Sequence, residues 1–505
     1  MSSPTEVPAE RGIEQNAAGG EPLPGPGTER IRGQSLWALL VAMAGTFMAI
    51  MDSFIVNVAV PSVQASLNAT FAQVELAVSG YVLVYGLLLV TGGRLGDLFG
   101  ARRLFLTGTA VFTLASLAAG LAGGPAALIA FRALQAVGAA MFYPQVLALL
   151  QTSFTGRARA IAFAVFGATI GLASIAGQVI GGLLIHLDLF GLGWRNVFLV
   201  NVPLGLLTLA GAARVLPAGR AAGRRARLDP AGVALLSTAL LLLSVPLTFG
   251  HQAGWPAWTR ISLIAAAPAA VAFLAWERAL AARGGDPLVD PALFRRRAFA
   301  AGNALAVVFF AGNAGLFFVL TLQLQNGMGH SPIAAGLTFL PLAAAFALAS
   351  LLGPRLEARI GHHVLTVGYA ANAAGTLALL LTAWSAGSGL TGRLLLPALA
   401  VIGFGEGLGV SLLIGTALRG VPAEDAGAAG GVLETAVQIG MSLGVTVLGL
   451  VFSAALGGDH EAAADPNVHA GAFTVALAGN LVLALAALAL LPALVRKRRV
   501  AARGH

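Results

Sequence analysis

Four ionisable side chains stand inside long apolar segments of this 505-residue sequence: Asp52, Arg132, Glu406 and Glu434. A charged side chain at the centre of a bilayer costs roughly 2.5 to 3.5 kcal/mol on insertion scales, so each needs a partner, a proton or a water-filled cavity. Burial disfavours the charged form of a carboxyl group and so favours proton uptake. We interpret the three acids as candidates for proton coupling, and we expect Arg132 to meet an acid, a carbonyl group or water. The alternative is that the carboxyl groups are neutral and hydrogen-bonded between helices, and that Arg132 reaches toward the membrane surface.

The composition indicates what must position these side chains. Hydrophobic residues make up 57% of the chain and charged residues only 10%, a balance that no water-soluble fold could cover with polar surface. We therefore predict an all-α polytopic membrane protein whose immediate surroundings are the lipid bilayer. The formal charge of +9 would favour nucleic acid only if the basic residues gathered on one soluble face, and they are scattered. We expect no nucleic-acid partner.

Apolar segments of about 20 residues predict fourteen transmembrane helices. They lie near residues 36–57, 74–94, 104–123, 126–150, 159–184, 196–216, 230–249, 261–280, 299–324, 333–354, 364–384, 394–416, 427–456 and 471–495. We divide the chain into a disordered cytoplasmic N-terminal tail (1–34), a six-helix bundle (35–217), two inserted helices with basic linkers (218–298), a second six-helix bundle (299–495) and a basic tail (496–505).

The arginines predict how the chain is oriented. Most of them fall in loops on one side of the predicted helices, together with both ends of the chain. Cytoplasmic loops carry such an excess of basic residues, so we expect both termini in the cytoplasm and the helices in the plasma membrane. Residues 93–100 and 354–361 share a leucine and a final glycine at equal spacing. Because both segments close the second helix of a six-helix unit, this weak repeat favours two parallel halves.

Several classes of protein are excluded by missing residues. There is no cysteine, which rules out disulfides and thiolate metal sites. The single lysine, Lys497, has no glycine-rich phosphate loop before it, and zinc-protease and nucleophile-elbow motifs are absent. We therefore expect no enzyme activity, no metal and no cofactor. A proton gradient is the expected source of energy.

The segment after the second predicted helix is expected to form a loop that acts as a conformational latch. It reads Gly-Gly-Arg-Leu-Gly-Asp-Leu-Phe-Gly-Ala-Arg-Arg from residue 92 and resembles the signature loop of the major facilitator superfamily. Glycine permits a tight turn, and an acid there would meet basic residues and a neighbouring helix N-terminus. The alternative is an ordinary solvated loop. The residues assigned to the latch are Gly93, Asp97, Gly100, Arg102 and Arg103.

Two further helices resemble motifs of the same superfamily. Arg132 and Gln135 stand as in its Arg-x-x-Gln-Gly element, which implies a role for Arg132 in proton transfer through an adjacent carboxyl group. The fifth helix resembles the antiporter motif of exporters, in which small residues let helices approach closely or bend. Close packing without a hinge is the alternative. Its motif residues are Gly167, Gly171, Gly177, Gln178, Gly181 and Gly182, with Gln178 where the motif has proline.

Residues 51–61 and 194–205 are similar to signatures of the fourteen-helix drug:proton antiporters, and the likeness covers about residues 36–495. This resemblance implies proton-coupled efflux of amphipathic drugs by alternating access, with a small-molecule substrate, protons and a monomeric transporter. The additional acids Glu406 and Glu434 would suit cationic substrates. An exporter of a self-made metabolite or lipid, and a proton symporter, remain alternatives.

Polar and amphipathic side chains within the predicted helices are candidates for the substrate cavity. Such residues either line a cavity or only bridge neighbouring helices, and the sequence does not distinguish the two. The candidates are Asn57, Tyr81, Tyr85, Tyr143, Gln145, Asn303, Asn313 and Gln438.

Overall fold

A computed structural model describes residues 33–69, 71–216, 228–250, 254–330, 332–361, 363–457 and 466–495. The basic tail predicted at 496–505, and the N-terminal tail predicted at 1–34 except for its last two residues, lie outside the described residues. Within the described ranges, fourteen helices are long and apolar enough to cross a membrane. The predicted all-α membrane fold and the number of crossings are confirmed.

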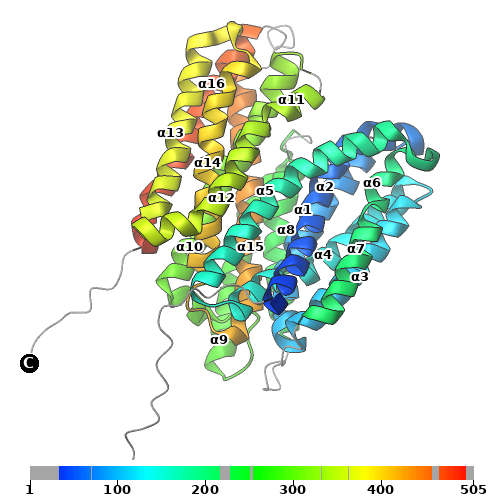
Figure 1. The fold of residues 1–505 in the computed structure, drawn as a ribbon, viewed down its shortest axis with the longest axis vertical. Helices are drawn as coiled ribbons and strands as arrows, with labels where there is room; N and C mark the ends of the chain where they lie inside the picture. The colour runs from blue at the N-terminus through cyan, green and yellow to red at the C-terminus, as the bar shows by residue number, and fades with distance from the viewer. Residues whose placement is uncertain are drawn as a thin grey trace, which may run out of the picture.

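The first six crossings begin at the blue end of Figure 1. The elements are α1 (Gly33–Leu67), α2 (Phe71–Phe99), α3 (Ala101–Gly120), α4 (Pro125–Ser153), α5 (Gly156–Leu187), the short turns η1 (Leu189–Gly191) and η2 (Gly193–Arg195), α6 (Asn196–Leu199) and α7 (Asn201–Val215). The sixth crossing thus begins with short helical pieces. The glycines at positions 191 and 193 both have positive φ, a conformation that interrupts a regular helix.

The inserted pair and the second set of six crossings follow. The pair is α8 (Pro230–Phe249) and α9 (Ala257–Ala282), followed by the turn η3 (Pro291–Arg295). The later elements are α10 (Arg297–Leu322), η4 (Gln323–Gly327), α11 (Pro332–Thr338), α12 (Leu340–Ile360), α13 (His363–Ala386), η5 (Gly387–Gly389), α14 (Gly392–Ala417), η6 (Ala423–Asp425), α15 (Ala426–Leu456) and α16 (Pro466–Val495).

The segment predicted as a loop at residues 93–100 is helical, and that prediction was wrong. α2 continues to Phe99, and α3 begins at Ala101. Only Gly100 turns the chain, with φ 94°, which a side chain would strain. α12 likewise continues to Ile360 and ends at Gly361, whose φ is 60°. The weak sequence repeat therefore marks two equivalent helix ends, each closed by a glycine of positive φ.

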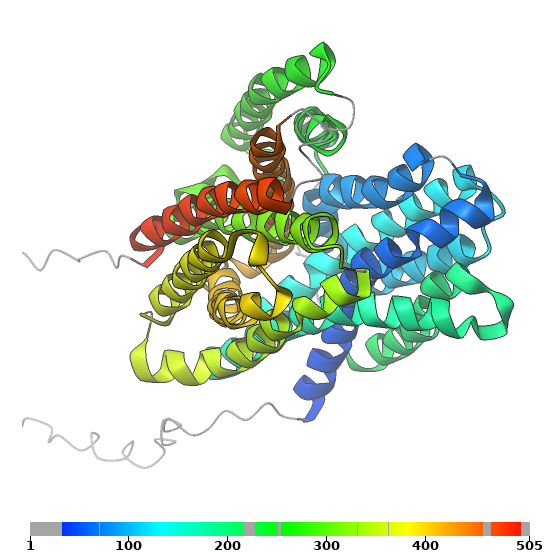
Figure 2. The same ribbon diagram turned by 90° about the horizontal axis from the view of Figure 1, so that it is seen from above.

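The helices form two bundles with the inserted pair beside them. α2 and α4 pack against α15, and α5 packs against α12 and α14, so each bundle contributes three helices to the contact between them. Figure 1 shows the two bundles diverging toward the end that carries α6 and α11. Figure 2 shows α8 and α9, in green, to one side of both bundles. There α8 contacts α2 and α15, and the Thr446 hydroxyl donates a hydrogen bond to the Leu247 carbonyl at 3.0 Å.

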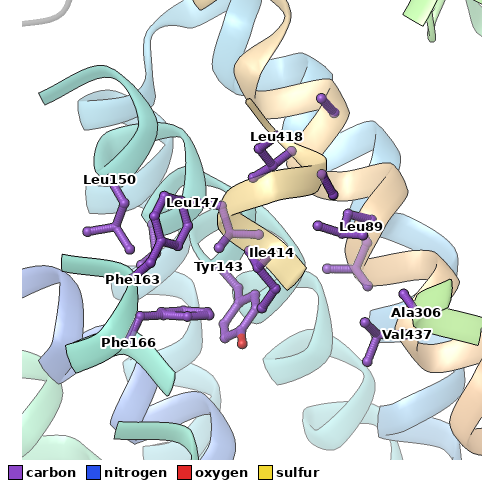
Figure 3. Packing of buried hydrophobic residues seen from close by; sticks show 14 of the residues in the cluster. Leu89, Tyr143, Leu147, Leu150, Phe163, Phe166, Ala306, Ile414, Leu418 and Val437 are labelled. Atoms are coloured by element: carbon purple, nitrogen blue, oxygen red, sulfur yellow. The ribbon is translucent and has the colours of Figure 1, made fainter. Parts of the chain in front are cut away.

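A continuous apolar core joins the bundles at the end where α2, α4 and α14 finish. Buried side chains from both sides interdigitate there, as the close view in Figure 3 shows. Separating the bundles at that end would expose these apolar side chains to water. From the first half come Leu89, Tyr143, Leu147, Leu150, Phe163 and Phe166, and from the second come Ala306, Ile414, Leu418 and Val437.

Candidate functional site

Asp52 lies at the centre of a closed hydrogen-bond network inside the first bundle. Its Oδ2 accepts a bond from Arg132 Nη1 at 2.6 Å, and its Oδ1 accepts from Gln135 Nε2 at 2.8 Å and from Asn201 Nδ2 at 2.7 Å. Gln135 Nε2 also lies 2.7 Å from the hydroxyl oxygen of Ser116. The network therefore ties α1, α3, α4 and α7 together through one carboxyl group.

Arg132 gives this carboxyl group its positive partner. The exposed fractions of the Asp52 and Arg132 side chains are 0% and 1%, so the pair is wholly removed from water. Arg132 also donates to the Ala77 carbonyl at 3.2 Å and to Gln135 Oε1 at 2.7 Å, and its guanidinium lies 4.1 Å from the Tyr81 ring centre. An arginine enclosed in this way does not extend to the membrane surface, so the alternative in which Arg132 reaches toward that surface does not describe it.

A row of tyrosines leads from this network toward the second bundle. The rings of Tyr81 and Tyr85 stack with centres 6.1 Å apart, and Tyr85 meets Tyr143 edge to face at 6.0 Å. All three side chains are buried. Tyr81 contacts Arg132, and the far end of the row lies near Glu434 of the second bundle. The row therefore joins the two acidic positions across the contact between the bundles.

Glu434 lies on the face of α15 that packs against the first bundle. Its Oε1 is 3.5 Å from Gln438 Nε2, one helical turn along. Gln438 lines a pocket of ≈ 430 Å³, opening included, between α2, α8 and α15. Gly86 and Ser244 line the same pocket. A carboxyl group, an amide and two tyrosine rings therefore converge beside a pocket that both bundles and the inserted helix α8 enclose.

Glu406 is placed differently. It lies inside the second bundle, in a cavity of ≈ 240 Å³, opening included, that is lined only by residues of α10, α13, α14 and α16. Asn313, a predicted cavity residue, lines this cavity and is hydrogen-bonded to Glu406. The two glutamates that the sequence grouped together thus occupy separate places.

Asp97 joins the end of α2 to the beginning of α15. Its Oδ1 and Oδ2 accept hydrogen bonds from the backbone N–H groups of Gly427 and Ala428, each at 2.8 Å. These N–H groups belong to the first turn of α15, where a helix favours negative charge. A Cβ on Gly93 would lie 2.1 Å from the Gly427 carbonyl oxygen, so only glycine permits this close crossing.

The basic residues of the predicted latch do not lie where the sequence suggested. Arg102 donates to the Ala213 carbonyl at 2.5 Å, within the first bundle, and Arg103 is exposed. The positive charge that acts on Asp97 belongs to Arg94. Asp425 stands just before α15, outside the membrane spans, and burial raises the pKa of its carboxyl group, as does the nearby Asp290, whereas Arg94 lowers it.

The glycines predicted as an antiporter motif lie along α5, which is helical throughout. A Cβ on Gly177 would lie 2.7 Å from the Met51 carbonyl oxygen, and one on Gly181 would lie 2.8 Å from Ile55 Cγ1. These two glycines therefore bring α5 close to the part of α1 that carries Asp52. Gly171 faces the second bundle instead, since its Cβ would lie 2.5 Å from Phe346 Cδ1. Gly167 is buried, and Gly182 has room around it.

The other predicted cavity residues differ in what they do: one bridges two helices, one bonds within its own helix, and one has a side chain outside the described residues. Gln145 donates to the Gly92 carbonyl at 2.9 Å and so bridges α4 and α2. Asn303 donates to the Phe299 carbonyl of its own helix at 2.9 Å. The side chains of Asn57 and Gln178 lie outside the described residues, so their assignments stay predictions.

The sequence reasoning did not assign a site role to several residues of these clusters. Gln135 and Asn201 lie within the sequence motifs described above, so the sequence could have identified both as site residues. Ser116, Asn372 and Asn480 are only isolated polar residues in apolar helices, and their part in the clusters follows from helix packing.

The comparisons with known proteins place this architecture. A family model described as the Major Facilitator Superfamily matches residues 42–445. This chain belongs to the major facilitator superfamily. Members of this superfamily are membrane transporters and not enzymes, and the fourteen apolar helices fit a multi-pass membrane protein.

Three relatives in this superfamily are named as transporters or resistance proteins. The "Probable actinorhodin transporter" of Streptomyces coelicolor is 40% identical over 88% of this chain and 77% of its own length. The cephamycin export protein of Amycolatopsis lactamdurans is 38% identical over 91% of this chain and 93% of its own length. The multidrug resistance protein Stp of Mycobacterium tuberculosis (strain CDC 1551 / Oshkosh) is 32% identical over 83% and 76%.

Solved structures show the same fold at low sequence identity. The human organic anion transporter MFSD10 matches with a TM-score of 0.62 and 15% identity, covering 90% of this chain and 99% of that chain. The proton:xylose symporter XylE matches with a TM-score of 0.59 and 14% identity, covering 89% and 94%. The predicted major facilitator fold is thereby confirmed.

Proposed function

We propose that this chain is a proton-coupled exporter of amphipathic, cationic small molecules that works by alternating access in the bacterial plasma membrane, with both termini in the cytoplasm. One observation carries the proposal. Glu434 lies near Tyr85 and Tyr143 across the contact between α15 and the first bundle, and its neighbour Gln438 lines a pocket between α2, α8 and α15. In an alternating-access transporter, a ligand held between the halves is exposed to either side of the membrane as they move.

The chemistry of this cluster suits a cation with an apolar body. Tyrosine faces attract cations, and a carboxylate supplies the opposite charge. The wall of the adjoining pocket is mostly apolar, and its polar groups are Ser244, Thr435, Gln438 and Ser442. This combination favours amphipathic molecules over sugars, which need many hydrogen-bond partners.

Proton exchange at Glu434 gives a mechanism for antiport. The ionised carboxylate binds a cationic substrate, and a proton at the same carboxyl group removes that attraction. Substrate and proton then compete for one group. One proton entering and one monovalent cation leaving move no net charge across the membrane. The pH gradient therefore supplies the energy for substrate release, without any cofactor.

We assign a supporting role to the Asp52 network. Protonating Asp52 would weaken its bond to Arg132, which contacts Tyr81 at the start of the tyrosine row. The row ends at Glu434, so the charge state of one bundle has a physical connection to the site between the bundles.

The latch is proposed to break and reform in each cycle. Asp97 holds the first turn of α15 against α2, and Gln151 donates across the same contact to the Leu418 carbonyl at 2.7 Å. Both bonds lie at the end where the bundles meet. Opening that end requires both to break, while Gly171 lets α5 slide against α12 at the opposite contact.

An exporter of one self-made metabolite or lipid is the second candidate. Two of the relatives are each named for a single compound, actinorhodin and cephamycin, whereas another is named for multidrug resistance. The shared fold does not decide the direction of coupling, because the matching structures include one titled a proton:xylose symporter. A proton symporter therefore remains an alternative for the test to exclude.

The test uses the purified full-length protein in acid-loaded liposomes that contain a pH-sensitive dye. Addition of ethidium, an amphipathic cation, is expected to cause proton efflux that is lost in Glu434→Gln and reduced in Asp52→Asn. Asn303→Ala is the matched control, since its amide bonds only its own helix. Proton movement in the same direction as ethidium would contradict antiport and support symport. Proton efflux that is unchanged in Glu434→Gln would contradict the assigned site.

A further inference from the structure

A second polar cluster lies entirely within the second bundle, away from the contact between the halves. Glu406, Asn313, Asn372 and Asn480 line one cavity of ≈ 240 Å³, opening included, and come from four different helices: α14, α10, α13 and α16. The exposed fractions of Glu406 and Asn480 are 2% and 3%. The remaining wall is mostly apolar, with Phe309, Leu316 and Leu483 among its residues.

The size and position of this cavity point to a small ligand. Its free interior has room for about one water molecule. All of its lining residues belong to one bundle, so the ligand would move with that bundle and would not be exposed by separation of the halves. These properties suit an ion better than the exported substrate.

In the described part of the chain, no basic side chain forms an ion pair with Glu406. Among the described residues, the ion pairs are Arg132 with Asp52 and Arg419 with Glu357, and neither involves Glu406. The Asp52 network occupies the first, third, fourth and sixth crossings of its bundle, and the Glu406 cluster occupies the same four crossings of the second bundle. Where Arg132 balances Asp52 in the first bundle, the second offers only asparagines.

The oxygen atoms of the cluster suit a hard cation. Asn480 Oδ1 is buried and has no hydrogen-bond donor, and it lies 3.2 Å from the Cβ position of Gly312 on the cavity wall. Carboxylate and carboxamide oxygens are the ligands that hard cations prefer. A single carboxylate balances one positive charge. In the described part of the chain, no three His, Cys, Asp or Glu side chains gather to hold a metal ion, which disfavours a divalent ion here.

We infer that the Glu406 cavity binds one alkali cation, held by the Glu406 carboxylate and the carboxamide oxygens of Asn313, Asn372 and Asn480. Bound there, the cation joins α10, α13, α14 and α16 through oxygen ligands, as the Asp52–Arg132 pair joins α1 and α4 through an ion pair. This site is additional to the proposed substrate and proton site at Glu434 and does not depend on it.

The experiment measures ion-dependent thermal stability of the full-length protein without substrate. The melting temperature Tm is followed by the fluorescence of the six tryptophans while NaCl replaces choline chloride at constant ionic strength and pH. A ligand that binds only the folded protein raises Tm with its concentration. We expect Tm to rise with Na⁺ and to saturate. Equal Tm in NaCl, KCl and choline chloride would overturn the inference.

Variants connect the Na⁺ effect to this cavity. Glu406→Gln and Asn480→Leu are expected to weaken the apparent Na⁺ affinity by about tenfold or more, since even indirect ligand changes typically cost that much. Glu406→Asp keeps a carboxylate and is expected to retain a Na⁺ response. Glu434→Gln is the matched control in the same bundle and should respond as the unaltered protein does. A Na⁺ response unchanged in both Glu406→Gln and Asn480→Leu would overturn the assignment.

The outcome is separate from that of the transport test. A Na⁺ response that depends on Glu406 supports the cation site even when ethidium moves no protons, in which case only the exporter proposal fails. Proton efflux that depends on Glu434, in a protein without any Na⁺ response, leaves the exporter proposal standing and overturns the cation site.

Discussion

The replacement Asp52→Asn tests the buried ion pair at the centre of the first bundle's hydrogen-bond network. Asp52 accepts three hydrogen bonds at 2.6–2.8 Å, from Arg132, Gln135 and Asn201. An asparagine keeps the size of the side chain but removes its charge and turns one acceptor into a donor. Arg132 would then be buried without a negative partner. Breaking a buried pair in this way typically costs about 3–5 kcal/mol.

This loss should be visible as a lower melting temperature. For a bundle of about 150–250 residues, 1 kcal/mol corresponds to roughly 2–4 °C in Tm, so we expect a decrease of roughly 6–20 °C. The measurement is tryptophan fluorescence of the purified protein in lipid nanodiscs. Thr46→Val is the matched control, because the Thr46 hydroxyl is buried in the same helix and donates only to the Ala42 carbonyl. Its Tm should change little.

A double replacement separates the ion pair from general disruption. Asp52→Asn combined with Arg132→Gln removes both charges and leaves no uncompensated one, so Tm should recover part of the loss seen in Asp52→Asn. The reasoning would be refuted if Asp52→Asn melts at the temperature of the unaltered protein. It would also be refuted if the losses of the two single replacements simply add in the double one.

Three further replacements test the latch, the glycine contact and the pH dependence. Asp97→Asn should lower the export rate at least tenfold with less effect on ethidium affinity, because the bonds of Asp97 to the start of α15 hold one conformation. An equal loss of ethidium affinity would contradict this role. Gly177→Ala should lower both Tm and the export rate, because its Cβ would lie 2.7 Å from a backbone oxygen. Gly182→Ala should be tolerated, because the nearest atom to its Cβ would lie at 4.0 Å. Similar Tm and export rates for the two variants would refute the argument. Burial raises the pKa of Asp425 above the ordinary 3.8, so its folded form binds a proton more readily, and Tm should fall as pH rises from 3.8 through the raised pKa. Asp425→Asn should flatten that slope in a Tm series against pH, and an unchanged slope would exclude Asp425 as its source.

Much of the fold follows from segment lengths alone. Each run of apolar residues long enough to span a bilayer became a helix, because a membrane leaves backbone groups no other partners. The helix ends were harder to place. The residues from Gly93 to Phe99 contain no strong helix breaker other than glycine, and the close packing of Gly93 on Gly427 keeps them helical.

The candidate site was predictable only in part. Asp52 and Arg132 could be recognised as charged residues in apolar helices, and their pairing follows from the need to bury both charges. Glu406 and Glu434 look alike in sequence, yet one faces its own bundle and the other faces the opposite one. That difference depends on how each helix is rotated against its neighbours, which local sequence does not record. Asn313 was predicted as a cavity residue, whereas Asn372 and Asn480, which line the same cavity, were not predicted, for the same reason.

The most direct test of the proposed function is the direction of ethidium movement under an imposed proton gradient. Proteoliposomes with equal ethidium inside and outside are given a pH gradient of either sign, with the membrane potential clamped. We predict that ethidium accumulates on the side from which the protons come, that accumulation reverses when the gradient reverses, and that Glu434→Gln abolishes it. Accumulation in the direction of proton flow, or none in either gradient, would contradict proton-coupled export.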